Sequence, residues 1–172
     1  VCTRAGLQGY PDVYGDTVVW TDWRDDPGDG SNTDIYAWDP VNLDHPICNA
    51  AGVQQYAVID YAGTVVWSDY RDAAQGNGAD LYSYHPAYGE GPVCAAPGDQ
   101  SDPAFSGTTV VWQDHRDERF TGWDIYAFYG WSAVPPEIRW TLYGPEGAVV
   151  QVPVFQFKAE PTTGGQGLQM QY

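Results

Sequence analysis

One stretch of sequence is written nearly three times along this chain, at intervals of about 46 residues. Each copy contains Val-Val-Trp-x-Asp-x-Arg-Asp, then Asp-Ile-Tyr or Asp-Leu-Tyr, and the cysteines Cys2, Cys48 and Cys94 hold equivalent positions. A repeat of this length is typical of one supersecondary unit that cannot bury its apolar face alone. Neighbouring copies must therefore stack, and this requirement constrains the fold more than any single residue does.

The apolar segments of each copy are short, rich in Val, Ile, Trp and Tyr, and separated by Gly, Pro, Asn and Asp. This pattern indicates β-strands. We expect a short first strand (12–14, 58–61 and 104–106), a Val-Val-Trp strand (17–22, 64–69 and 109–114), an Asp-Ile-Tyr strand (34–38, 80–84 and 124–128) and a fourth strand that ends at cysteine (1–2, 46–48 and 92–94). Four antiparallel strands in such a repeat are typical of a β-propeller blade. The predicted fold is all-β, with three four-stranded propeller-type blades and a short C-terminal β segment.

The copies divide the chain into three parts. Residues 1–129 form the three-repeat array, and residues 130–136, which include Pro135 and Pro136, are typical of a linker. Residues 137–172 alternate strand and turn signals, and we expect them to be a β tail or a source of donated strands.

The recurring polar residues indicate architecture, because a catalytic carboxylate would be expected once, in one cleft. We expect each arginine to pair with the aspartate some ten residues later and so to fix the hairpin loop between them. The structural set is Trp20, Asp22, Arg24, Asp34, Trp67, Asp69, Arg71, Asp80, Trp112, Asp114, Arg116 and Asp124.

The repeat unit, Gln-x-x-Pro-x-x-x-Gly through Val-Val-Trp-x-Asp-x-Arg-Asp to Asp-Ile-Tyr and Ile-Cys, resembles the TolB-type propeller repeats of archaeal and bacterial cell-surface proteins. Copy two departs from the pattern, because Ala57 stands where the other copies have Pro11 and Pro103. The resemblance implies a scaffold or binding surface without a shared catalytic residue, located outside the cell or at its surface.

The net charge of -16, from 23 acids and 7 bases, argues against nucleic-acid partners, whose phosphates such a surface repels. No apolar run is long enough to span a membrane. The sequence contains no nucleophile elbow, phosphate-binding loop or histidine metal spacing, so we expect a protein that is not an enzyme.

The loop between the second and third strands of copy one is rich in acids. Asp25, Asp26, Asp29 and Asp34 are candidate ligands for Ca²⁺, which prefers six to eight hard oxygens. The alternative is an acidic turn, since Asp side chains bond nearby backbone N–H groups. No other cofactor is expected. The three cysteines are interpreted as buried thiols, with an intermolecular bridge through Cys2 as the alternative.

Three blades cannot close a propeller, so both ends of the array are predicted to expose unpaired edges. We expect residues at the two edges, Val1, Cys2, Thr3, Phe128 and Tyr129, to join copies head to tail, as a ring or a filament. The predicted function is a non-enzymatic extracellular structural protein that self-assembles. The alternatives are a module whose exposed aromatics bind glycans or a partner protein, a propeller-type hydrolase, and a fragment of a longer propeller.

Overall fold

The computed structural model describes residues 1–75, 78–116 and 122–129. These residues belong to one compact unit, Val1–Ala133. The predicted linker (130–136) and C-terminal tail (137–172) lie outside the described residues, so the strands expected there stay predictions. Within the described part, no helix has the length and hydrophobicity of a membrane-spanning segment.

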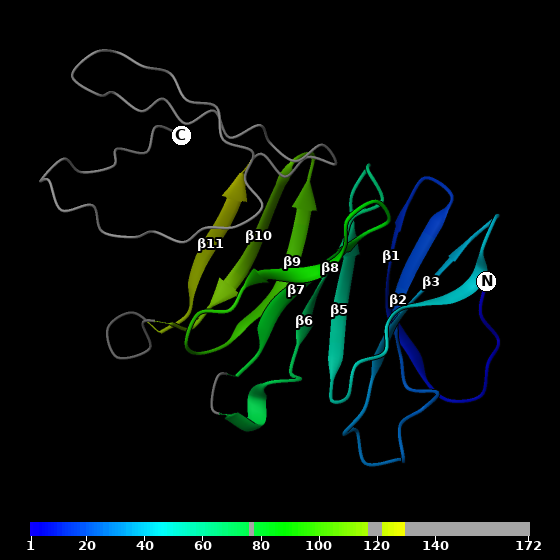
Figure 1. Ribbon diagram of the computed structural model, residues 1–172, viewed down its shortest axis with the longest axis horizontal. Helices are drawn as coiled ribbons and strands as arrows, with labels where there is room; N and C mark the ends of the chain where they lie inside the picture. The colour runs from blue at the N-terminus through cyan, green and yellow to red at the C-terminus, as the bar shows by residue number, and fades with distance from the viewer. Residues whose placement is uncertain (76–77, 117–121, 130–172) are drawn as a thin grey trace, which may run out of the picture. The chain divides into compact units, whose positions relative to one another are not determined.

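The described residues are all-β, as predicted, with eleven antiparallel strands and one 3₁₀ turn, η1 (Ala73–Gln75). Each repeat forms its own sheet, and Figure 1 shows β5 lying between the first sheet and the third. Sheet one contains β1 (Gln8–Tyr14), β2 (Thr17–Asp22), β3 (Asp34–Asp39) and β4 (Leu43–Cys48). Sheet two contains β5 (Gln54–Ile59), β6 (Val65–Asp69), β7 (Asp80–His85) and β8 (Gly89–Cys94). Sheet three contains β9 (Gln100–Ser106), β10 (Thr109–Asp114) and β11 (Asp124–Tyr129).

The predicted strand positions were most accurate where apolar residues dominate. Strands β2 and β10 have the predicted bounds, whereas β1, β5 and β9 begin four residues before the predicted first strands, at a glutamine in each copy. Residues 1–2 form no strand, contrary to expectation. The thiol of Cys2 instead donates to Asp44 of β4, 3.7 Å away, and Arg4 donates to the same carboxylate.

Every first strand is interrupted by a β-bulge at the same position. The register with the second strand shifts after Gly9, after Gln55 and between Val111 and Gln113. The bulge residues Tyr10, Tyr56 and Asp102 have φ angles of 51°, 60° and 51°. Residues other than glycine rarely adopt this left-handed backbone conformation, so the surrounding structure must stabilise it. In the second and third sheets a bond to the preceding sheet holds this backbone: Tyr56 N–H donates to Thr21 Oγ1 and Asp102 N–H to Ser68 Oγ, each at 3.2 Å.

The sheets pack face to face. Val19, Ile35, Ala37 and Cys48 of sheet one pack against Ala57, Ile59, Val65 and Trp67 of sheet two. On the other side of sheet two, Val66 and Leu81 pack against Val110 and Trp112 of sheet three. Sheet two is therefore covered on both faces, and all five residues of β6 are buried. Alternating side chains of one strand thus contribute to two separate cores.

Candidate functional site

Each repeat places a Trp, an Asp, an Arg and a Tyr in one cluster. In the second repeat Asp69 is fully buried, and its carboxylate accepts a hydrogen bond from Trp67 Nε1 at 2.8 Å and from the Arg71 backbone N–H at 2.9 Å. Arg71 Nε and Nη2 donate to the two oxygens of the same carboxylate, at 2.9 and 2.6 Å. The Arg71 guanidinium lies 4.1 Å from the centroid of the Tyr82 ring. The arrangement combines a bidentate ion pair with a cation–π contact.

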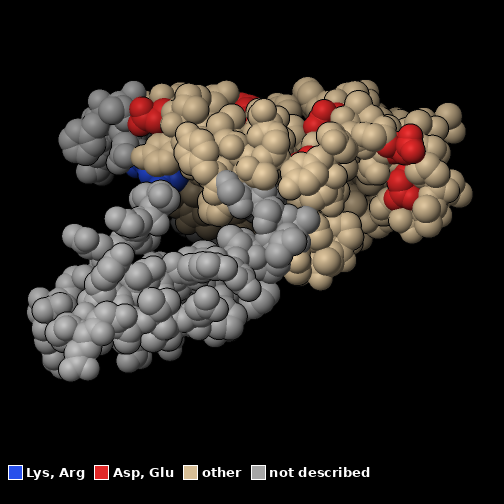
Figure 2. Space-filling model, turned by 90° about the horizontal axis from the view of Figure 1, so that it is seen from above, with Lys and Arg blue, Asp and Glu red and all other residues tan. Residues whose placement is uncertain are grey.

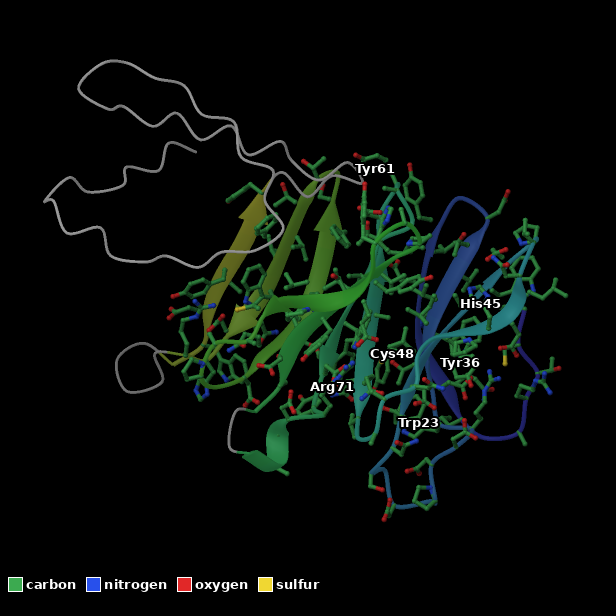
Figure 3. All side chains as sticks on the ribbon, in the orientation of Figure 1. Trp23, Tyr36, His45, Cys48, Tyr61 and Arg71 are labelled. Carbon is green, nitrogen blue, oxygen red and sulfur yellow. The ribbon has the colours of Figure 1, made fainter. Side chains whose placement is uncertain are left out.

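The cluster also connects one repeat to the one before it. Arg71 Nη2 lies 3.3 Å from Cys48 Sγ at the end of β4, and Figure 3 shows both side chains near the boundary of the first two sheets. Arg24 contacts Cys2 at 3.5 Å, and Arg116 contacts Cys94 at 3.1 Å. The cysteines are all free thiols, and burial raises the pKa of Cys48 to about 12. Cys48 therefore stays protonated at neutral pH and acts as a small buried group, as expected from the sequence. Cys2 and Cys94 are only partly buried, contrary to expectation.

The predicted arginine partners were wrong. We expected Arg24, Arg71 and Arg116 to pair with Asp34, Asp80 and Asp124, ten residues or so later. The structure pairs them with Asp22, Asp69 and Asp114, two residues earlier. In a strand, residues two apart point to the same face, so the tryptophan and this aspartate lie together and the arginine that follows folds back onto them. Arg24 reaches Asp44 as well, and Arg71 reaches Glu90.

Charge within the clusters is largely neutralised. Burial would raise the pKa of Asp22, but hydrogen bonds from Arg24 and Trp20 hold it below its usual value. The pKa of Asp114 is lowered in the same way by Arg116 and Trp112, against the effect of burial. Such saturated carboxylates have no capacity left for proton transfer at neutral pH. The recurrence and saturation of the cluster favour a structural role.

The acids of the predicted calcium loop do not converge. Asp26 accepts hydrogen bonds from the backbone N–H groups of Gly28, Gly30 and Asn32, and Asp29 accepts one from Ser31. Asp25 is exposed, whereas Asp34 is buried in β3. No group of three or more metal-ligating side chains occurs in the described ranges. Ca²⁺ binding stays a prediction, and a melting temperature unchanged by added Ca²⁺ would count against it.

The two ends of the stack of sheets expose apolar faces. We call the outer face of sheet one, at Val13 and Val18, the leading face, and the outer face of sheet three, at Val111, Ile125 and Tyr129, the trailing face. Ile125 is 75% exposed, although the equivalent Ile35 and Leu81 are 0% exposed inside the stack. Val13 is 60% exposed, whereas the equivalent Ile59 is 6% exposed. The side chains that pack sheets together are thus present at both ends without a described sheet against them.

The residues predicted to join copies lie near these ends. Phe128 and Tyr129 belong to β11, at the outer edge of the sheet order as described. Val1 is 72% exposed, and Cys2 is held against sheet one by Asp44 and Arg24. Sequence reasoning missed Ile125 and Val13. Both could have been found by aligning the copies, since each replaces a residue that the stack buries elsewhere.

Neither a protein-family model nor a curated protein matches this sequence. The resemblance to TolB-type repeats therefore stays a prediction based on the repeat motif itself.

Proposed function

We propose that this protein is a non-enzymatic structural protein, extracellular or at the cell surface, that self-assembles head to tail. In this proposal the three sheets are blades of a propeller-type array of the TolB kind. The leading face of one copy covers the trailing face of the next. The joint is heterologous, so repeated addition closes a ring or extends a filament.

The observation that carries the proposal is the difference in exposure at equivalent positions. Ile35 and Leu81 lie at 0% exposure in the two internal contacts between sheets, and Ile125 lies at 75% on the trailing face. An internal contact of this kind is a template for a contact between copies, because the same residue types recur at both ends. Burying a side chain of this size contributes about 1.5–3 kcal/mol. An exposed sheet face invites the partner that would cover it.

The direct test uses two substitutions on opposite faces. Ile125→Asp and Val13→Asp each place a charge at a position that is exposed in the single chain, so both variants should fold. Each variant alone should sediment as a monomer where the unmodified protein forms larger species. An equimolar mixture should form dimers and nothing larger, because one intact trailing face meets one intact leading face.

The control is Val41→Asp, which adds the same charge at a position that is 86% exposed in the turn after β3. It should assemble as the unmodified protein does. An unmodified protein that stays monomeric at about millimolar concentration, where even weak contacts of about -4 kcal/mol form, contradicts the proposal. A variant mixture that stays monomeric contradicts the head-to-tail arrangement.

Strand exchange is a separate part of the expected joint. Residues 1–3 and the β11 edge, at Phe128 and Tyr129, were predicted to add backbone hydrogen bonds between copies. Deleting residues 1–5 checks this part alone. If the shortened chain assembles with unchanged affinity, the joint is made by the apolar faces without exchanged strands.

A further inference from the structure

A solvent-open hollow of about 310 Å³ lies where the first strands of the three sheets approach one another. Its lining comes from equivalent positions in β1, β5 and β9, namely Tyr10, Pro11, Asp12, Tyr56, Ala57, Val58, Asp102 and Pro103. The volume is at the lower limit for small-ligand pockets and suits one side chain or a fragment of similar size. The hollow is separate from the end faces on which the proposed assembly depends.

The bulges direct the lining side chains. Tyr10, Tyr56 and Asp102 are the three bulge residues with positive φ, and each is thereby turned toward the hollow that β1, β5 and β9 share. The repeat requires the bulge backbone in its second and third copies, because its N–H bridges neighbouring sheets there. It does not require the side chain, which is tyrosine in two copies and aspartate in the third. The packing of the sheets therefore does not explain why tyrosine and aspartate side chains line the hollow.

The lining combines aromatic rings with carboxylates. The rings of Tyr10 and Tyr56 meet edge to face with centroids 4.7 Å apart, and Trp23 lies 6.0 Å beyond Tyr10. Figure 3 shows Trp23 beside the loop that follows β2. Asp12 accepts a hydrogen bond from the Ile59 backbone N–H at 2.9 Å. Asp102 accepts one from Gln113 Nε2 at 3.0 Å and one from Ser101 Oγ at 3.5 Å. None of the lining residues is Lys, Arg or His, and no described salt bridge engages either carboxylate.

The same combination of tyrosine rings and aspartates already binds arginine side chains elsewhere in this chain. In each repeat a guanidinium lies 3.7–4.1 Å from a tyrosine ring centroid and pairs with an aspartate. The hollow offers the same two groups, tyrosine rings and aspartates, with no described cation between them. The chain carries a charge of -16, and Figure 2 shows acidic side chains scattered over one face of the described residues. This field attracts cations toward the hollow.

We propose that the hollow binds the guanidinium group of an arginine side chain presented by a peptide or protein partner. The planar group stacks on Tyr10, which is the more exposed of the two rings, and its charge faces Asp12 and Asp102. Arginine is favoured over lysine, because a guanidinium stacks on aromatic rings and is less strongly hydrated than an ammonium. This binding does not depend on self-assembly.

The test titrates the full chain with the capped tripeptide acetyl-Gly-Arg-Gly-amide, followed by NMR of the tyrosine rings. The same peptide with citrulline, which keeps the shape and removes the charge, should bind at least about 10-fold more weakly. The lysine peptide should bind more weakly than the arginine peptide. Tyr10→Ala should weaken arginine binding about 2- to 30-fold, and Tyr10→Phe should keep it within about 2-fold.

A matched pair of variants separates the hollow from general attraction by the acidic surface. Asp102→Asn should weaken binding, whereas Asp16→Asn removes the same charge from an exposed turn and should not. Equal loss in the two variants contradicts the proposal, as does equal binding of the arginine and citrulline peptides. Unchanged binding by Tyr10→Ala contradicts it as well. Shifts that appear on Tyr88 and not on Tyr10 or Tyr56 would move the arginine to another surface and overturn the assignment.

Discussion

A single carboxylate in each repeat organises several side chains. Asp69 receives the indole N–H of Trp67, the backbone N–H of Arg71 and two guanidinium N–H groups, and the guanidinium then covers Tyr82. All of these partners belong to the second repeat. Arg71 also contacts Cys48, which belongs to the first repeat. The residues that recur in the sequence therefore recur because they form one hydrogen-bonded unit.

Replacing Arg71 with alanine should destabilise the protein by about 2–4 kcal/mol. The change leaves the carboxylate of Asp69, which is 0% exposed, without its cation, and an uncompensated buried charge is costly. Arg4→Ala is the control, because Arg4 is 67% exposed and its pair with Asp44 should contribute less than about 1 kcal/mol. Urea denaturation of both variants measures the difference. A loss below about 0.5 kcal/mol for Arg71→Ala would show that the cluster is not a stabilising unit.

Asp34 should make stability depend on pH in the opposite direction from the clusters. Burial, reinforced by the charges of Asp25 and Asp22, raises the pKa of Asp34 from 3.8 to about 6. The folded state therefore binds this proton more tightly than the unfolded state. The resulting stabilisation is fully present below 3.8 and is lost as pH rises through 6. Between pH 7 and pH 5 the gain should be about 1 kcal/mol.

The variant Asp34→Asn isolates this contribution. It should be more stable than the unmodified protein at pH 7, and its free energy of unfolding should change less between pH 7 and pH 5. Urea titrations at the two pH values provide the comparison. If the variant gains as much as the unmodified protein, the gain comes from general relief of repulsion among the acids and not from Asp34.

At the scale of elements, the glycine before the bulged first strand lets that segment lie against the end of the second strand of its own sheet. Gly98 has a φ of +86°, and a Cβ at this position would lie 2.7 Å from the carbonyl oxygen of His115. His115 N–H in turn donates to Asp99 O at 2.8 Å. The backbone of the loop after β10 thus packs directly on the segment that leads into β9, and only glycine leaves room for it.

Gly98→Ala should therefore cost about 2 kcal/mol more than Gly107→Ala. Both glycines have positive φ, which costs about 1 kcal/mol for alanine, but nothing lies within 4 Å of a Cβ at Gly107. Chemical denaturation measures the two free energies. Equal losses would show that the close approach of the His115 carbonyl relaxes without cost.

The strands could be predicted from the sequence where period-2 apolar patterns are clear, as in β2 and β10. The first strands could not be fully predicted, because Pro11 is unfavourable in a strand, while the bulge places it inside β1. Positive φ at Tyr10 has no local signal, since neither glycine nor asparagine stands there. The sequence pattern did not show that each arginine pairs with the aspartate two residues before it. The two-residue spacing of Trp20 and Asp22 did indicate that these two side chains lie on the same face of the strand.

For the whole molecule, the charge and the apolar end faces together predict how assembly responds to salt. Copies that each carry a charge of -16 repel one another, and salt screens this repulsion, with a Debye length of about 10 Å at 0.1 M. An apolar joint is not weakened by moderate salt. The association constant should therefore rise between about 0.05 and 0.5 M NaCl. Sedimentation velocity at both salt concentrations measures the association constant. An association constant that falls with salt would show that ion pairs hold the copies together.

Strand β6 is buried along its full length between two cores. Its backbone amides bond to β5 on one side and β7 on the other, so local fraying at the ends of the chain leaves them covered. Exchange of these amides with deuterium should then require the cooperative opening of both neighbouring sheets, whereas amides of β1 and β11 exchange through smaller openings. The protein should show its slowest-exchanging amides at Val65–Asp69, and the protection of that one strand reports the stability of the whole stack.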